Sequence, residues 1–281
     1  MKKIFLSLFV ATLGLSVNAQ IEAPQPSPSS KLEQKVGLTD VTVEYSRPGV
    51  KGRKVFGNLV PYGNLWRTGA NANTVVTFSQ DVTIDGKALK KGSYAIFTKP
   101  SASSWEVIFY NDTNNWGTPR QWDDKKVALT TNVKVQTMPM LVETFTITID
   151  DVMNGSAVLG ILWENTYAGI KFEVPTDKAV TANIDKVMAG PGANDYYAAA
   201  SYYMEEGKDI NKAKMWIGKA VEMTKDKPRF WYLRKQSLIH EKAGDKAGAI
   251  KAAKASLMHA EKAGNADYIK MNKDALKKWG A

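Results

Sequence analysis

Cysteine is absent from this sequence of 281 residues. Without cysteine the chain cannot form disulfide bonds, use a catalytic thiol or bind a metal through thiolates. Histidine is nearly absent too, because His240 and His259 are the only two and neither lies at the spacing of a zinc motif. We therefore predict a fold that depends on the burial of apolar side chains, with no cofactor and no metal.

Long apolar runs are also missing, apart from one near the start. Two lysines precede an uncharged stretch at residues 4–17, and small residues follow up to Ala19. This stretch is shorter than the roughly 20 apolar residues that a membrane-spanning helix needs. The pattern is typical of a secretory signal peptide over residues 1–19, so we expect a periplasmic or secreted protein without a transmembrane segment.

Positive charge is concentrated in the C-terminal part of the chain. Residues 20–175 carry 16 lysines and arginines against 15 acids, whereas residues 176–281 carry 20 against 13. This excess favours contact with acidic surfaces such as envelope glycans or lipid headgroups. The alternative is a solvated, lysine-rich helix surface without a partner. For an exported protein we expect no nucleic-acid partner.

The stretch from Ser46 to Thr74, here called the central stretch, contains no carboxylate but holds five glycines, two prolines and five cations. The cations are Arg47, Lys51, Arg53, Lys54 and Arg67. In one interpretation the glycines and prolines set turns, Trp66 fills the core and Arg67 donates hydrogen bonds to loop carbonyls. In the other, the five cations form an anion-receptive surface.

Motifs in and after the central stretch resemble those of a known family. They are Ser46-Arg47-Pro48, Gly52-Arg53-Lys54, Val60-Pro61-Tyr62-Gly63, Trp66-Arg67-Thr68-Gly69-Ala70-Asn71 and Gly92-Ser93-Tyr94. In residue order they are similar to the secreted bacterial domain-of-unknown-function 2911 family, over residues 30–174. The resemblance implies an envelope β domain with no assigned activity, so it supplies no catalytic residues.

Apolar and polar residues alternate through much of residues 31–175, which indicates strands with one buried face. The expected strands are residues 39–45, 74–79, 82–84, 93–98, 105–110, 127–135, 142–150, 156–163 and 167–174. Asp85-Gly86 and Asn154-Gly155 are typical of hairpin turns, and the spacing from Leu89 to Tyr94 is that of a tyrosine corner. We predict a Greek-key antiparallel β-sandwich at residues 31–175, after a proline- and serine-rich linker at residues 20–30.

From Thr176 the apolar period changes from two residues to 3.6, which predicts helices up to the end of the chain. After a first helix and a Gly-Pro-Gly break, the expected helices are residues 195–206, 210–224, 229–242, 245–263 and 266–279. Ala213 and Ala220 recur 36 positions later as Ala249 and Ser256, a pattern that resembles tetratricopeptide repeats. The whole prediction is an α+β chain of two domains, a β-sandwich at 31–175 and a helical repeat region at 176–281.

The polar loop at residues 110–122 carries the candidate binding residues. Amphipathic aromatics beside asparagine and aspartate suit stacking on sugar rings or peptide side chains. We predict ligand contacts from Tyr110, Asn111, Asp112, Trp116 and Trp122, with Arg67 as a polar partner. The alternative is that both indoles fold back and cover the end of the sheet.

These features predict a non-catalytic binding or scaffold protein of the cell envelope that recognises a glycan, a peptide or a protein partner. The alternative is a hydrolase that acts on envelope glycans or peptides through carboxylates. A cleft that brings Asp112, Asp123 or Asp124 close to another acid would favour the hydrolase. An aromatic platform without such an acid would favour binding.

Overall fold

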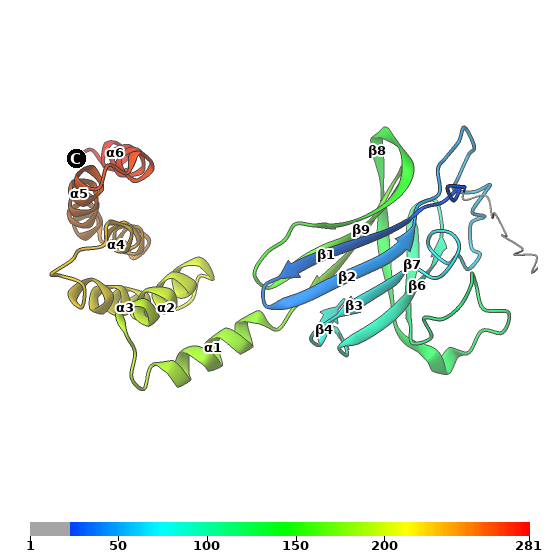
Figure 1. Ribbon diagram of the computed structural model, residues 1–281, viewed down its shortest axis with the longest axis horizontal. Helices are drawn as coiled ribbons and strands as arrows, with labels where there is room; N and C mark the ends of the chain where they lie inside the picture. Colours follow the sequence, from blue (N-terminus) through cyan, green and yellow to red (C-terminus); the bar gives the residue numbers. More distant parts are fainter. Residues whose placement is uncertain (1–22) are drawn as a thin grey trace, which may run out of the picture. The chain divides into compact units, whose positions relative to one another are not determined.

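The computed structural model describes residues 23–281, so the predicted signal peptide and the first residues of the predicted linker lie outside the described residues. The described chain forms two compact units, one up to Pro175 and one from Thr176. The first unit contains the β-strands, and the second contains six α-helices (Figure 1). The architecture is therefore α+β in two parts.

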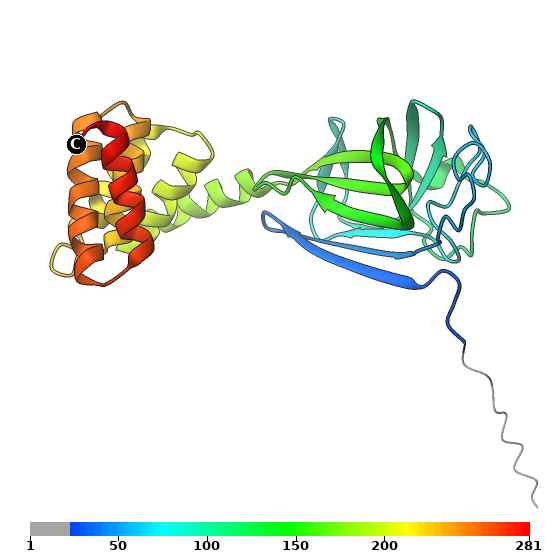
Figure 2. The ribbon, with the colours of Figure 1, turned by 90° about the horizontal axis from the view of Figure 1, so that it is seen from above.

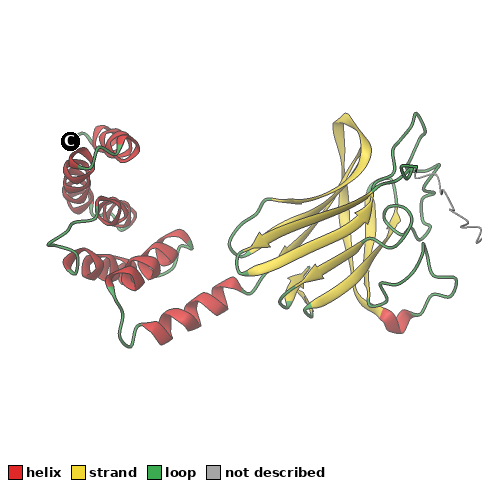
Figure 3. Cartoon of the chain, in the orientation of Figure 1, coloured by secondary structure: helices red, strands yellow, loops and turns green. Residues whose placement is uncertain are grey.

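Nine strands of the first unit, here called the β unit, form one antiparallel sheet in the order β1-β2-β3-β6-β7-β8-β9-β4-β5 (Figure 3). They are β1 Ser29–Val36, β2 Thr39–Ser46, β3 Val75–Phe78, β4 Val82–Ile84, β5 Lys87–Leu89, β6 Gly92–Pro100, β7 Ser104–Tyr110, β8 Val127–Asp150 and β9 Ser156–Glu173. The long strand β8 pairs with β7 through its first part and with β9 through its second part. It thereby joins the two halves of the sheet.

Both halves of the sheet contribute side chains to one hydrophobic core. In β2 the alternation of the sequence places Val41, Val43 and Tyr45 on the buried side. Phe78 of β3 meets Phe172 of β9 with ring centroids 5.5 Å apart. Strands from distant places in the strand order therefore enclose the same apolar interior.

The number of strands is nine, as expected, but the strands differ from those predicted. The two strands predicted at 127–135 and 142–150 are one strand, β8, and those at 156–163 and 167–174 are one strand, β9. The strand β1 includes Ser29 and Ser30 of the predicted linker. Neither β1 nor the three-residue strand β5 was predicted. Every second side chain from Ser29 to Lys35 in β1 is exposed and three of these are charged, as suits an edge strand.

Two local predictions for turns are confirmed. Asp85 and Gly86 connect β4 to β5, and both have the positive φ, 51° and 71°, that a tight hairpin turn requires. The hydroxyl of Tyr94 donates a hydrogen bond to the carbonyl oxygen of Lys90 at 2.7 Å. This is the backward bond expected of a tyrosine corner.

The second unit contains six helices, of which α5 and α6 lie side by side in Figure 2. They are α1 Thr176–Val187, α2 Ala193–Glu205, α3 Ile210–Glu222, α4 Phe230–Lys242, α5 Lys246–Lys262 and α6 Ala266–Trp279. The small residues of the 36-residue pattern, Ala213, Ala220, Ala249 and Ser256, are all buried. Within the described part of the chain, no helix has the length and apolar character to cross a membrane.

Candidate functional site

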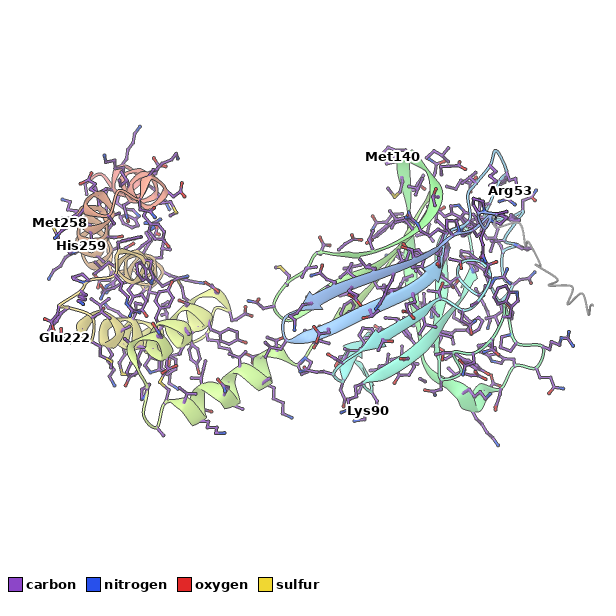
Figure 4. The ribbon with its side chains drawn as sticks, viewed as in Figure 1. Arg53, Lys90, Met140, Glu222, Met258 and His259 are labelled. Carbon is purple, nitrogen blue, oxygen red and sulfur yellow. The ribbon has the colours of Figure 1, made fainter. Side chains whose placement is uncertain are left out.

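A pocket of about 390 Å³, here called the central pocket, opens in the β unit. Most of its lining comes from the central stretch, with Thr118 from the loop at 110–122 and Trp163 from β9. The cations among its lining residues are Lys51, Arg53 and Arg67, and none of the described residues that line it is an acid. Figure 4 shows Arg53 on the loops of the β unit. The surroundings of the pocket therefore favour a negatively charged group.

The backbone of the central stretch holds Arg67 in place through turns and one short bridge. The N–H of Trp66 donates to the carbonyl of Thr98 in β6 at 2.7 Å, and the N–H of Thr98 donates back at 2.9 Å. Gly69 follows with φ of 139°, where a Cβ atom would lie 3.2 Å from the carbonyl oxygen of Ser46. Only glycine fits this close approach without strain, so the position of Arg67 depends on Trp66 before it and on Gly69 two residues after it.

Aromatic rings form one wall of the central pocket. The rings of Trp66 and Trp163 stack with centroids 5.9 Å apart and planes at 16°. The edges of Phe56 and Phe145 pack against both indoles. Trp66 thus packs on the hydrophobic core, as the first interpretation of the central stretch expects, and it also lines the pocket.

The arginines of the central stretch differ in their hydrogen bonds. Arg47 donates to the carbonyl of Phe145 at 3.0 Å, and Arg53 donates to the carbonyl of Val50 at 2.9 Å. Arg67 does not follow them, because its buried Nε atom has no hydrogen-bond partner in the described structure. Donation to a loop carbonyl therefore describes Arg53, whereas Arg47 donates to a carbonyl of strand β8. The expectation that Arg67 donates to loop carbonyls is wrong for its Nε atom.

The central pocket contains a second buried donor without a partner. Trp163 is only 2% exposed, yet its Nε1 atom meets no acceptor among residues 23–281. A buried donor left unsatisfied costs about 1–3 kcal/mol. The Nε atom of Arg67 and the Nε1 atom of Trp163 therefore both lack an acceptor within the described protein, and both residues line the same pocket.

Asn73 fixes the loop at 110–122 to the central stretch. Its Oδ1 atom accepts a hydrogen bond from the N–H of Asn115 at 3.1 Å, and its Nδ2 atom donates to the carbonyl of Gly117 at 3.1 Å. A Cβ atom on Gly117 would lie 2.8 Å from Nη1 of Arg67, so the loop backbone lies directly against the guanidinium. The structure thus brings Arg67 and this loop together.

The aromatic residues predicted for the site lie in two different environments. Tyr110 is buried and stacks on the half-buried Trp122, with centroids 4.4 Å apart, beside Phe97. Trp116 is 78% exposed. The alternative in which indoles cover the end of the sheet therefore fits Trp122 and does not fit Trp116.

The polar residues predicted for the site are at the base of the same loop. Asn111 is exposed, and its backbone N–H donates to the carbonyl of Lys126. Asp112 forms an ion pair with Lys126 at 2.7 Å. Neither residue lines the central pocket, so of the six predicted residues only Arg67 does.

The carboxylates considered for a hydrolase are each engaged by a donor. The hydrogen bond from Lys126 is the main reason why the pKa of Asp112 lies below its usual range. Asp123 accepts from the N–H of Lys125, and Asp124 accepts from the indole of Trp122. A glycosidase acid needs a raised pKa instead. The described residues also contain no group of three or more histidines and acids that could hold a metal.

Two residues of the site were not identified from the sequence. Trp163 belongs to a strand pattern, where a tryptophan is expected to be a core residue. Asn73 has no local motif, and its role depends on a loop 42 positions away. A buried donor without a partner is visible only once the surrounding strands are in place.

Comparisons with known proteins place the β unit in a family. A family model described as a protein of unknown function, DUF2911, matches residues 27–172. Comparisons with curated proteins and with solved structures gave no match. The matched region is just over half of the 281 residues and includes the whole central stretch and the loop at 110–122. The chain therefore belongs to the DUF2911 family.

Proposed function

We propose that the protein is a non-catalytic binding protein of the cell envelope and that its β unit recognises a glycan. The exposed indole of Trp116 carries this proposal. It is 78% exposed, and the bridge between Ala72 and Trp116 holds it on a loop that also lines the central pocket through Thr118. An indole has few rotatable bonds, and on a backbone held in this way it offers a flat apolar face at low entropic cost, which suits stacking on a sugar ring.

The proposal includes the location and the finer fold. The protein is exported by the signal peptide at residues 1–19 and acts in the periplasm or outside the cell. The β unit is a Greek-key sandwich, which the hydrogen bond of Tyr94 to Lys90 supports. The helical unit is a degenerate tetratricopeptide-like repeat, which the buried small residues at a spacing of 36 support.

Binding is favoured over hydrolysis by the state of the acids near the loop. Asp112 is ion-paired with a lowered pKa, and an acid in this state does not readily donate a proton to a leaving group. The same side of the β unit offers cations and an exposed indole instead. Peptide and protein partners remain the other outcomes of the test.

The test is binding of the full chain to an array of neutral and acidic oligosaccharides and peptides. We expect glycan binding, and we expect Trp116→Ala to weaken it about fivefold, as loss of one stacking contact of about 1 kcal/mol predicts. The melting temperature of this variant should stay unchanged because the side chain is exposed.

Met140→Ala is the matched control, because Met140 is a large apolar residue of the β unit that is 62% exposed and lies outside the lining of the central pocket (Figure 4). It should bind as the wild type does. Failure of the wild-type chain to bind any glycan, or full binding by Trp116→Ala, would overturn the proposal. Binding to peptides alone would replace the glycan by a peptide.

A further inference from the structure

We propose that the central pocket binds the carboxylate of an acidic sugar residue, with Arg67 and Trp163 as its donors. The inference rests on the proposed function, because it names the chemistry of the glycan. It depends on different residues, however, because Trp116 is exposed and does not line the pocket, whereas Arg67 and Trp163 do. The two proposals can therefore fail separately.

The first step is that two buried N–H groups have no hydrogen-bond acceptor among the described residues. The neighbouring indole, Trp66, has its Nε1 atom satisfied by the carbonyl of Gly69 at 3.2 Å. Trp163 and Arg67 have no such partner for their buried nitrogens in the part of the chain that the structure describes. Neither nitrogen can accept a hydrogen bond, so the group that satisfies them must present oxygen acceptors.

The second step is the sign of the charge. Lys51 and Arg53 are exposed at the same pocket as Arg67. Two carboxylates contact the central stretch nearby: Glu143 accepts from the backbone N–H of Lys51 at 2.8 Å, and Glu164 accepts from the backbone N–H of Val55 at 3.3 Å. Neither glutamate is part of the lining. Acceptor oxygens that carry a negative charge therefore complement the pocket.

The third step is the choice between a carboxylate and a phosphate as the anionic group of the ligand. The planar fork of an arginine matches a carboxylate with two parallel hydrogen bonds. Phosphate sites in proteins often use the N-terminus of an α-helix, and no α-helix is found among the described residues of the β unit. A single carboxylate thus fits the donors that the pocket offers.

The fourth step concerns the part of the ligand to which the carboxylate is attached. The two indoles, Leu59 and Val60 give the pocket apolar walls, which suit the C–H faces of a sugar ring. A volume of about 390 Å³ lies at the lower end of the range for ligand pockets. The pocket is therefore matched to one ring of a chain, and the rest of the glycan can continue towards Trp116.

The test compares ligands with the same ring in titrations of the full chain, followed by calorimetry or NMR. We expect glucuronate to bind at least tenfold more tightly than glucose, and to lose affinity as salt is added. Tighter binding of glucose 6-phosphate than of glucuronate would overturn the carboxylate in favour of a phosphate. Tighter binding of N-acetylphenylalanine would overturn the sugar in favour of a peptide terminus.

Variants test the two donors. Arg67→Lys keeps the charge but removes the Nε donor, and Trp163→Phe keeps an aromatic ring but removes Nε1. Each should lower the affinity for glucuronate about tenfold and thereby reduce the preference for glucuronate over glucose. Arg120→Lys changes an exposed arginine of the loop at 110–122 that does not line the pocket, and it should change neither the affinity nor the preference. If Trp163→Phe fails to fold in a melting experiment, Arg67→Lys decides the question.

The two proposals give different results with these variants. If Arg67→Lys binds glucuronate as the wild type does while Trp116→Ala still weakens oligosaccharide binding, the pocket inference fails alone. If Arg67→Lys weakens glucuronate binding while Trp116→Ala changes nothing, the stacking role of Trp116 in the proposed function fails alone.

Discussion

The hydroxyl of Tyr94 is a single group whose removal has a defined cost. The residue is 5% exposed, and its hydroxyl donates to the carbonyl of Lys90 at 2.7 Å. We expect Tyr94→Phe to lower the free energy of unfolding by about 1 kcal/mol, because the ring packing stays and one hydrogen bond is lost. Urea denaturation measures this change.

Tyr62→Phe is the control for this prediction, because Tyr62 is 46% exposed. It should stay within about 0.5 kcal/mol of the wild type, as is usual for exposed positions. Equal stability of Tyr94→Phe and the wild-type chain would show that the bond to Lys90 contributes nothing to the fold.

Single residues differ in how far the sequence predicts them. The bond of Tyr94 was predicted because its donor and acceptor are four positions apart and belong to one motif. The hydrogen bonds of Arg47 were not predicted, because the carbonyl that accepts from its Nε atom lies 98 positions away. The unsatisfied donors of Arg67 and Trp163 could not be predicted for the same reason, since they depend on which strands surround them.

At the scale of elements, strand β9 carries two glycines that make room for an aromatic ring. A Cβ atom on Gly160 would lie 2.8 Å from Cε2 of Tyr167, and one on Gly169 would lie 2.9 Å from Cε1 of the same ring. The hydroxyl of this tyrosine donates to Oδ2 of Asp150 in β8 at 2.9 Å. The glycines therefore leave space for the ring of Tyr167, whose hydroxyl links β9 to β8.

We expect Gly160→Ala to lower the free energy of unfolding by about 1–3 kcal/mol, because the added methyl group displaces Tyr167 and the carboxylate of Asp150. Urea denaturation of the full chain measures this loss. Gly155→Ala is the control, since a Cβ atom at Gly155 has no described atom within 4 Å. Similar stabilities for the two variants would show that the ring can move without cost.

The elements of the helical unit were predicted more closely than those of the β unit. Each of the helices expected after the Gly-Pro-Gly break corresponds to one helix from α2 to α6, with ends within three residues. Helix signals are local, because the apolar period and the caps lie in the same segment. Asp209, Asp245 and Asn265, for example, accept hydrogen bonds from the first turns of α3, α5 and α6.

Strand ends were harder to predict because pairing is not local. The break expected near residues 136–141 does not end β8, although its pairing with β9 shifts register between Thr137 and Val142. Glu164 has φ of 55° within β9 and yet the strand continues. In both places the pairing of β8 with β9 continues past an irregularity, where the sequence predicts two separate strands.

At the scale of the whole molecule, each unit has hydrophobic clusters of its own. The large cluster of the β unit contains buried residues from Val36 to Val174. The helical unit has one cluster around Ile217 and Tyr232 and another around Leu276 and Trp279. A unit whose apolar residues pack within it can in principle fold alone.

We therefore expect a fragment of residues 20–175 to fold without the helices. Its strands pair with one another in one sheet, and its core draws its residues from this part of the chain alone. The fragment should unfold in a single cooperative transition, and its melting temperature should agree within a few degrees with one transition of the full chain, as expected of an independent domain. Calorimetry of both proteins measures this.

This experiment tests whether the boundary between residues 175 and 176 separates two units that fold independently. A fragment of residues 176–281 is the matched partner, and its helical circular dichroism should melt at a temperature that the full chain also shows. If the β fragment has strand signal but no cooperative transition while the full chain unfolds cooperatively, the helices stabilise the core of the β unit. The ligand-binding experiments would then require the full chain, because the central pocket would not be held in shape by the β unit alone.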